Sequence, residues 1–335
     1  MKTLNPEVLS QVARTLSEAA SWYIFSHMKL DGDALGSGSA LFEAGLLQGK
    51  NVRWTGPDPV PPSYDYLPNV ENYRIQESYV FDSREILHIF LDSADEDRGV
   101  KGLRDARLPH AFILNIDHHE DNSLFGTMNC VEPGVSSVAE LLWHIMQAGG
   151  WNITPRVAEG LYTGIISDTG GFMYSNTSPE THRVAADLLC REVDPAKIDA
   201  ALRQNRSLEG MHLWGLALSR ICRFGVQSQI AMTWLSRKDF ETTGAIVADT
   251  ESLVNQLLLI QGVRFAAMVT EGEKDARVSF RSRAGAVTAA SVARSLGGGG
   301  HPRAAGTTLP LPLEDAIQIV RTTVENAYAE WFAAD

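Results

Sequence analysis

Short apolar segments alternate with helix-forming segments through the first half of the chain. Residues 22–25, 86–91 and 111–116 are apolar runs of strand length, whereas the apolar positions of residues 6–20 have helical spacing and residues 34–48 continue as a second helix. Parallel strands need long crossover connections, and these are usually helices. The alternation therefore predicts an α/β fold with a mostly parallel, doubly wound sheet.

The strand pattern changes near residue 221, where apolar strands begin to come in pairs. Residues 221–226 precede 229–234, and residues 263–269 precede 277–282 with a polar hairpin loop between them. With 335 residues, the chain has the length of about two domains. We therefore predict a first domain over residues 1–190, a linker over 191–215 and a second, smaller α/β domain with a mixed sheet over 216–335.

The composition is that of an ordinary soluble protein, with 44% hydrophobic and 21% charged residues. No apolar run approaches the roughly 18 residues of a membrane span and no export signal opens the chain, so we expect a cytoplasmic protein that does not bind membranes. Three cysteines are scattered, which fits neither a disulfide framework nor a zinc cluster. The net charge of −12 argues against long duplex nucleic acid as a partner but allows a short anionic substrate, because bound cations can reverse the local potential.

Aspartate and histidine residues gather at the ends of the predicted elements. Four segments carry them, and their members are His27, Asp31 and Asp33, then Asp92, then Asp117, His118 and His119, and finally Asp168. Open α/β sheets bind ligands outside the carboxyl ends of their strands. Carboxylate and imidazole ligands without cysteine favour manganese or magnesium. Because one ion needs only three or four such residues, the excess predicts two divalent ions, and a carboxylate such as Asp92 could bridge them.

Each of these segments also has a purely structural explanation. Asp33 could cap the helix that follows it, Asp92 and Asp168 could be turn residues, and the histidine pair could simply be structural. These explanations would have to hold in four places at once. The occurrence of Asp and His in all four segments therefore favours a metal centre for phosphoryl transfer, in which paired ions stabilise the attacking and the leaving oxygen.

The second domain contains a glycine tract followed by a histidine, with arginines nearby. Glycines would let backbone N–H groups approach an anion closely, although such tracts are also often flexible loops. Residues 261–310 contain seven Lys or Arg against three Asp or Glu, and guanidinium groups bind phosphate well. The candidates for binding an anionic substrate are Arg264, Arg281, Arg283, Gly298, Gly299, Gly300 and His301.

Five segments of the chain resemble, in the same order, the DHH–DHHA1 phosphoesterase family, and within it the branch of nanoRNases and pAp phosphatases. The matching segments are 26–37, 91–93, 117–119, 164–170 and 298–306. The resemblance implies a phosphodiesterase that uses a metal-activated water to hydrolyse oligoribonucleotides of roughly two to five residues to mononucleotides. Removal of the 3′ phosphate from pAp is a related activity of this branch, and a homodimer is compatible with it.

The resemblance also implies roles for the site residues. His27, Asp31 and Asp92 would hold one manganese ion, and Asp33, Asp92, His118 and Asp168 would hold the other, with magnesium as the alternative metal. Asp117 would orient an imidazole, as metal-bound histidines usually require. His119 would face the scissile phosphate. The second domain would bind the nucleotide end of the substrate, chiefly through Arg281, Arg283 and His301.

Other functions share some of these features. Hydrolysis of cyclic di-AMP or of its linear product would use the same metal centre. An inorganic pyrophosphatase would use a similar metal set, but with a clamp of Lys and Arg in place of Gly-Gly-Gly-His. A regulatory module that senses a nucleotide would keep the glycines and arginines without six metal ligands, and a structural scaffold would need neither. The presence of all six expected ligands favours the enzyme.

Overall fold

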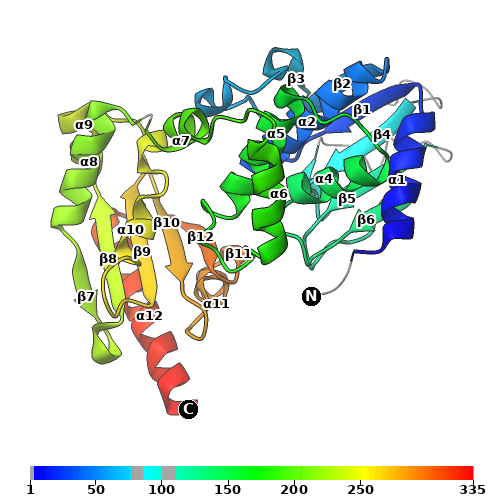
Figure 1. Cartoon of the computed structure of the whole chain (residues 1–335). Helices are drawn as coiled ribbons and strands as arrows, with labels where there is room; N and C mark the ends of the chain where they lie inside the picture. Colours follow the sequence, from blue (N-terminus) through cyan, green and yellow to red (C-terminus); the bar gives the residue numbers. More distant parts are fainter. Residues whose placement is uncertain (1–3, 77, 79–85, 100–110, 205, 335) are drawn as a thin grey trace. The chain divides into compact units, whose positions relative to one another are not determined.

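A computed structural model of the chain describes residues 4–76, 78, 86–99, 111–204 and 206–334. It divides into two compact units, residues 1–205 and 206–335 (Figure 1). The division falls inside the segment 191–215, for which the sequence suggests a linker. That segment is largely helical, since it contains α7 (Pro195–Arg203) and the first part of α8 (Leu208–Ser219). Each unit has a sheet and a hydrophobic core of its own.

The first unit contains a six-stranded sheet whose strand pairs are parallel. Its strands are β1 (Ser21–Phe25), β2 (Asn51–Gly56), β3 (Tyr73–Ile75), β4 (Ile86–Leu91), β5 (Ile113–Asp117) and β6 (Met128–Val131). They lie in the order β3-β2-β1-β4-β5-β6, so the strand order reverses between β1 and β4. The predicted α/β fold with a parallel, doubly wound sheet is confirmed, and the carboxyl ends of β1 and β4 form the switch point at which such sheets bind ligands.

Helices of the first unit pack into the same core as Trp22 and Ile24 of the central strand. They are α1 (Pro6–Glu18), α2 (Gly32–Leu47), α4 (Val138–Ala148), α5 (Pro155–Asp168), α6 (Pro179–Leu189) and α7, with 3-10 helices at Pro62–Tyr64, Val70–Asn72 and Glu96–Arg98. The alternate residues Tyr23 and Phe25 lie on the other side of the sheet, in an aromatic cluster with Phe90. Because β1 is buried on both sides, its sequence is continuously apolar and does not alternate.

Helices α2 and α5 approach each other at glycines. A Cβ atom added at Gly36 would lie 2.4 Å from the carbonyl oxygen of Gly160 and 2.7 Å from the backbone nitrogen of Gly164. A real Cβ atom does not tolerate such distances, so only glycine allows the two helices to pack this closely. The first turn of α2 carries Asp33, and α5 ends at Asp168. The helix contact therefore sets the separation of two predicted metal ligands.

The second unit contains a mixed six-stranded sheet, as predicted. Its strands are β7 (Cys222–Phe224), β8 (Ile230–Leu235), β9 (Phe265–Glu271), β10 (Ala276–Ser282), β11 (Gly299–His301) and β12 (Ala304–Leu309). They lie in the order β11-β12-β10-β9-β8-β7, with β8 and β9 parallel and the other pairs antiparallel. The glycine tract is therefore partly an edge strand, β11, and not wholly a flexible loop.

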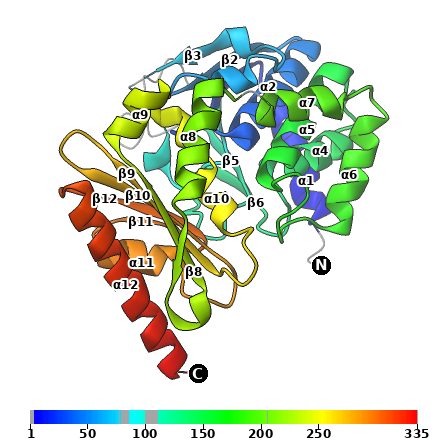
Figure 2. The same cartoon turned by 90° about the vertical axis from the view of Figure 1, so that its left-hand side faces the viewer.

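Helices lie on both faces of this second sheet (Figure 2). They are α8, α9 (Arg237–Thr243), α10 (Leu253–Leu257), α11 (Ala289–Ser295) and α12 (Leu313–Ala334), with 3-10 helices at Val226–Ser228 and Val247–Thr250. Val278 and Phe280 of β10 pack in the core with α11 and α12, whereas Ala266 and Met268 of β9 pack in the core with α8 and α10. None of the described helices is long and apolar enough to cross a membrane.

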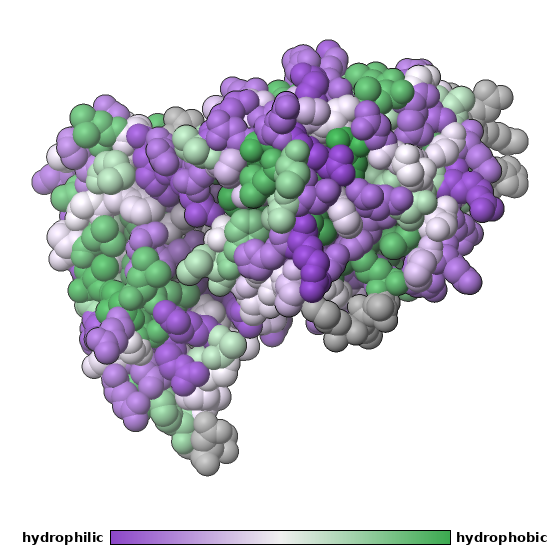
Figure 3. Space-filling model, in the orientation of Figure 1, coloured by the Kyte–Doolittle hydropathy of each residue, from purple (hydrophilic) through white to green (hydrophobic). Residues whose placement is uncertain are grey.

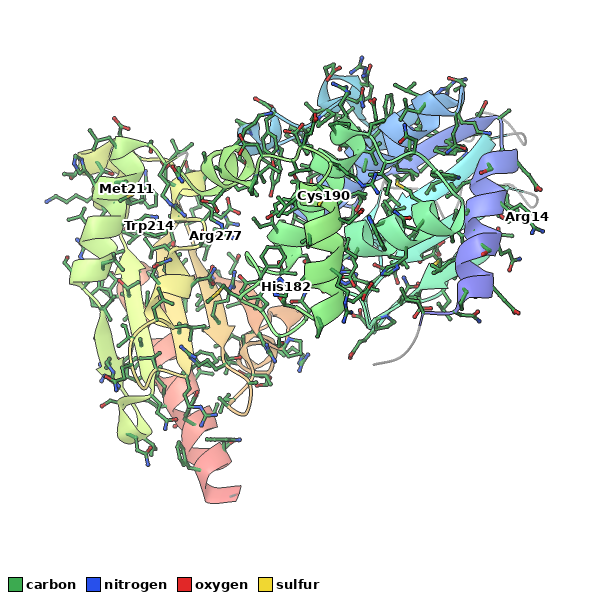
Figure 4. The ribbon with its side chains drawn as sticks, in the orientation of Figure 1. Arg14, His182, Cys190, Met211, Trp214 and Arg277 are labelled. Carbon is green, nitrogen blue, oxygen red and sulfur yellow. The ribbon has the colours of Figure 1, made fainter. Side chains whose placement is uncertain are left out.

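Helix α8 is apolar on its outer side as well as on its inner side. Leu213 and Trp214 are buried in the core, whereas Leu208, Met211 and Leu218 are exposed. Figure 3 shows residues of high hydropathy, in green, on the surface of the second unit, and Figure 4 labels Met211 and Trp214 on α8. The composition of α8 alone therefore does not reveal which of its sides faces the sheet.

Candidate metal centre

The loop after β1 holds His27 with both of its ring nitrogens engaged. His27 is 3% exposed, and its Nδ1 lies 2.6 Å from the carbonyl oxygen of Met28, so Nδ1–H donates to the backbone. Its Nε2 faces two carboxylates, at 3.2 Å from Asp92 Oδ2 and 3.7 Å from Asp31 Oδ1. A backbone acceptor on one ring nitrogen directs the other toward a metal, as is usual for metal-bound histidines.

Asp31 caps helix α2. Its Oδ1 accepts hydrogen bonds from the backbone N–H groups of Asp33 and Ala34, at 3.1 and 3.0 Å. The alternative that Asp33 is the capping residue is therefore wrong. Asp33 is one of the first residues inside α2, where its side chain turns inward and is 1% exposed. Asp31 therefore caps the helix, and Asp33, two residues later, is free to turn its carboxylate into the interior of the first unit.

Asp92 follows β4 and lies between two imidazoles. Its Oδ2 faces His27, and its Oδ1 lies 3.5 Å from His118 Nε2. The residue is 3% exposed, and among the described residues its Oδ1 has no hydrogen-bond partner. A buried carboxylate oxygen without a donor is costly unless a charge or an ion satisfies it. This oxygen therefore fits a metal ligand, and the carboxylate as a whole fits a bridge between two ions.

A second group of potential ligands surrounds His118. One ligand atom each of Asp33, His118 and Asp168 lies within 4.8 Å of the others, as do those of His27, Asp31 and Asp92 in the first group. The carboxylate of Asp33 accepts hydrogen bonds from the N–H groups of Val138 and Ala139 in the first turn of α4. These bonds orient the carboxylate and leave it beside Asp168.

Asp117 orients His119. It is fully buried, and its Oδ1 lies 2.8 Å from His119 Nδ1, while Asn122 donates a hydrogen bond to its Oδ2. His119 Nδ1 is also 3.6 Å from Asp92 Oδ1, and His119 forms a further candidate group with Asp92 and His118. Sequence reasoning missed Asn122 and also Asn176, whose side chain donates to the backbone oxygen of Asp168. Neither stands in a motif, and only the fold brings them to the site.

The carboxylates of the candidate metal centre favour positive charge at the site. Burial opposes protonation of His27, but hydrogen bonds and charges of Asp31 and Asp92 raise its pKa to about 11. Burial likewise opposes protonation of His118, yet its carboxylate neighbours raise its pKa to about 10. Burial and the neighbouring carboxylates raise the pKa of Asp33. Carboxylates this close to one another favour bound cations, and metal ions can take the place of the protons.

The candidate residues of the second unit are not all equally available. Arg264 donates to the carbonyl oxygen of Gly285, and Arg283 donates to that of Leu258 at 2.6 Å, so both guanidinium groups hold local backbone. Arg281 lies on β10, is half-buried, and donates to the carbonyl oxygen of Phe280 at 2.9 Å. Gly298 precedes the edge strand β11, which begins with Gly299 and Gly300 and ends at His301, and the side chain of His301 lies outside the described residues.

Comparison with known proteins identifies the family of both units. Residues 21–165 match the DHH family, N-terminal domain, and residues 232–330 match the DHHA1 domain. The bifunctional oligoribonuclease and PAP phosphatase NrnA of Thermus thermophilus is 34% identical over 91% of this chain and 89% of that protein. An exopolyphosphatase-related protein of Bacteroides fragilis has the same fold, with a TM-score of 0.91, 24% identity and 99% coverage of both chains. RecJ of Thermus thermophilus, solved with Mn²⁺, has a TM-score of 0.56 at 16% identity and covers 98% of this chain and 56% of that one.

The chain therefore belongs to the DHH family of phosphoesterases and is a hydrolase. Within that family, it is similar over nearly its whole length to proteins named oligoribonuclease and PAP phosphatase. The resemblance seen in the sequence is thus confirmed for both domains.

Proposed function

We propose that this protein hydrolyses short oligoribonucleotides to mononucleotides and removes the 3′ phosphate from pAp, with two divalent ions as cofactors. The observation that carries the proposal is the position of Asp92. Its two carboxylate oxygens face His27 and His118 separately, and one of them is buried without a donor among the described residues. Manganese is the first choice, because the ligands are carboxylates and imidazoles and because a RecJ protein of the same fold binds Mn²⁺.

Two groups of side chains would hold the ions. His27, Asp31 and Asp92 form one group, and Asp33, His118 and Asp168 form another. We assign Asp92 to the second group as well, because its Oδ1 lies 3.5 Å from His118 Nε2. When bound, the ions would lower the pKa of a water and stabilise the charge that develops on the phosphate. The surrounding chain keeps the ligands in place: Met28 orients His27, the first turn of α4 orients Asp33, and Asn176 holds the end of α5 beside Asp168.

His119 would contact the substrate phosphate. His119 Nδ1–H donates to Asp117. Burial opposes protonation of His119, but Asp117 and Asp92 raise its pKa, so the protonated ring could donate from Nε2 to a phosphate oxygen. Asn122 holds the second oxygen of Asp117 and fixes its plane. In the second unit, we assign Arg281, Gly298, Gly299, Gly300 and His301 to the part of the substrate that is not cleaved, with Arg264 and Arg283 as supports of the neighbouring backbone.

A panel of substrates tests this proposal. The purified protein with Mn²⁺ is given an end-labelled diribonucleotide, pAp, cyclic di-AMP and pyrophosphate in parallel assays. We expect the diribonucleotide to be cleaved fastest and pAp to release inorganic phosphate. Metal removal with a chelator should abolish both activities, and added Mn²⁺ should restore them. Faster release of phosphate from pyrophosphate than of mononucleotide from the dinucleotide would refute the assignment.

A further inference from the structure

Arg277 and Arg281 project from the same face of strand β10. Val278 and Phe280 alternate with them and are buried with α11 and α12, so the two arginines point to the opposite face. Four positions along a strand correspond to roughly 13 Å between the Cα atoms. Two guanidinium groups at this spacing on one face of the sheet suit two phosphates of one RNA strand better than a single phosphate.

Small residues lie beside the two arginines on the β12 side of β10, whereas on the β9 side Ala266 and Met268 are buried in the core with α8 and α10. In the register of β10 with β12, Arg277 pairs with Thr308, Ser279 with Gly306 and Arg281 with Ala304. On the next strand, Gly299 of β11 pairs with Gly306. Gly299 and Thr308 are exposed, and Ser279, Ala304 and Gly306 are partly exposed. On the β12 and β11 side, the sheet surface beside the arginines therefore carries no long side chain among these residues and could accommodate an RNA strand.

The hairpin before β10 is acidic, whereas β10 carries Arg277 and Arg281. Residues 271–275 read Glu-Gly-Glu-Lys-Asp, and Arg277 follows two positions later. Arg277, labelled in Figure 4, is exposed. None of the ion pairs in the described part of the chain includes it. A phosphate bound at Arg277 would have Arg281 on one side along β10 and the acidic hairpin of residues 271–275 on the other. The positive path along β10 therefore ends at Arg277.

We propose that Arg277 forms a second phosphate subsite that is used only by substrates longer than about two nucleotides, and that the acidic hairpin closes this path to longer strands. This proposal rests on the proposed function and extends it. It assigns Arg281 to the RNA phosphate nearer the glycine tract, and it assigns Arg277 to a phosphate farther along the same RNA strand. Because Arg277 lies four positions from Arg281 on β10, a diribonucleotide or pAp bound at Arg281 would be too short to occupy both arginines.

Steady-state kinetics of Arg277→Ala on pAp, a diribonucleotide and a pentaribonucleotide test the subsite. We expect kcat/KM on the pentaribonucleotide to fall by about 10-fold, chiefly through KM, because a hydrogen bond to a charged group is lost. The rates on pAp and the diribonucleotide should stay within about twofold of the wild type, and Arg277→Lys should keep most of the activity, since a charge remains. Arg223→Ala is the matched control: it removes the same charge from β7, at the other edge of the sheet.

Salt dependence gives a second readout. For the pentaribonucleotide, the slope of log KM against log salt concentration should decrease by about 0.7 in Arg277→Ala, since one phosphate contact with a single strand is lost. The slope for the diribonucleotide should not change. Equal losses on all three substrates, or no loss on the pentaribonucleotide, would overturn the subsite. A wild-type protein that cleaves neither the diribonucleotide nor pAp would instead refute the proposed function.

Discussion

Asp92 occupies a left-handed backbone position, with φ of 57°, at the end of β4. Aspartate and asparagine adopt this region more readily than other non-glycine residues, but it still costs free energy. The cost is accepted at a point where the carboxylate lies between His27 and His118. The backbone strain, the buried unpaired oxygen and the two imidazoles therefore point to the same role for this residue.

Asp92→Asn should abolish turnover while preserving the fold. Asparagine keeps the shape of aspartate and tolerates positive φ, but it cannot offer two charged oxygens to two ions. We expect kcat to fall by more than about 100-fold, since even substitutions behind a metal ligand cost 10- to 100-fold. Elemental analysis should show fewer than two ions per folded chain.

The matched control for this substitution is Asp121→Asn, which removes an exposed carboxylate two residues after His119. It should leave both rate and metal content near the wild-type values. A folded Asp92→Asn protein with two tightly held ions and a normal rate would exclude the bridging role.

Asp239 makes the stability of the second unit depend on pH. Two hydrogen bonds from the Arg220 guanidinium, at 2.5 and 2.7 Å, lower the pKa of Asp239 to about 2 against the opposing effect of burial. The folded pKa lies below the unfolded value of about 3.9, so the ion pair stabilises the fold above pH 4 and loses this effect as the pH falls toward 2.

Asp239→Asn should therefore destabilise the protein by about 2 kcal/mol at pH 6 and by much less near pH 2.5. Urea denaturation at several pH values measures the difference between the variant and the wild type. A difference that grows as the pH falls would contradict the assigned ion pair.

Helices α2 and α5 determine how close Asp33 and Asp168 come to each other. Gly36→Ala would place a Cβ atom 2.4 Å from the carbonyl oxygen of Gly160, so one helix must move. Overpacking of this kind typically costs about 1–3 kcal/mol. Because α2 carries Asp33 and α5 ends at Asp168, we expect lower activity and weaker metal binding as well as a lower free energy of unfolding.

Gly215→Ala is the matched control for this element. Gly215 lies in the exposed part of α8, where an added Cβ meets no atom within 4 Å. Alanine in a helix interior is favoured over glycine by up to about 1 kcal/mol, so this variant should gain stability and keep its activity. If Gly36→Ala behaved in the same way, the close contact of α2 and α5 would not govern the metal centre.

The net charge of −12 sets an expectation for the whole molecule. A long anionic strand is repelled by the acidic surface, whereas a short one can bind at the cations and metal ions of the site. We expect kcat/KM to be highest for single-stranded RNA of roughly two to five nucleotides, to fall for strands of about 20, and to be lowest for duplexes.

A ladder of RNA lengths at fixed ionic strength measures this dependence. Higher salt should raise the rate on the longest strands relative to the shortest, because it screens the repulsion. A rate that stays flat or rises with length would favour a processive exonuclease and would defeat the short-substrate proposal, while leaving the metal centre untouched.

The sequence by itself determined the α/β class and the identity of the residues that gather at the candidate metal centre. Strand length, apolar runs and the position of Asp92 after β4 are local properties, and parallel strands bring their carboxyl ends to one edge. The five ordered segments added the family, because each combines residue types at a fixed spacing. These features could be predicted since none of them depends on which distant side chain becomes a neighbour.

Only the tertiary structure decided the partners of those residues. Asp31 and Asp33 are two positions apart and chemically identical, yet the first caps α2 and the second binds the N–H groups of α4, more than a hundred residues away. Asn122 and Asn176 joined the site without a motif, and the glycine tract became an edge strand because β12 supplies its hydrogen-bond partners. Such choices depend on packing between elements far apart in the sequence, and local patterns carry no information about that packing.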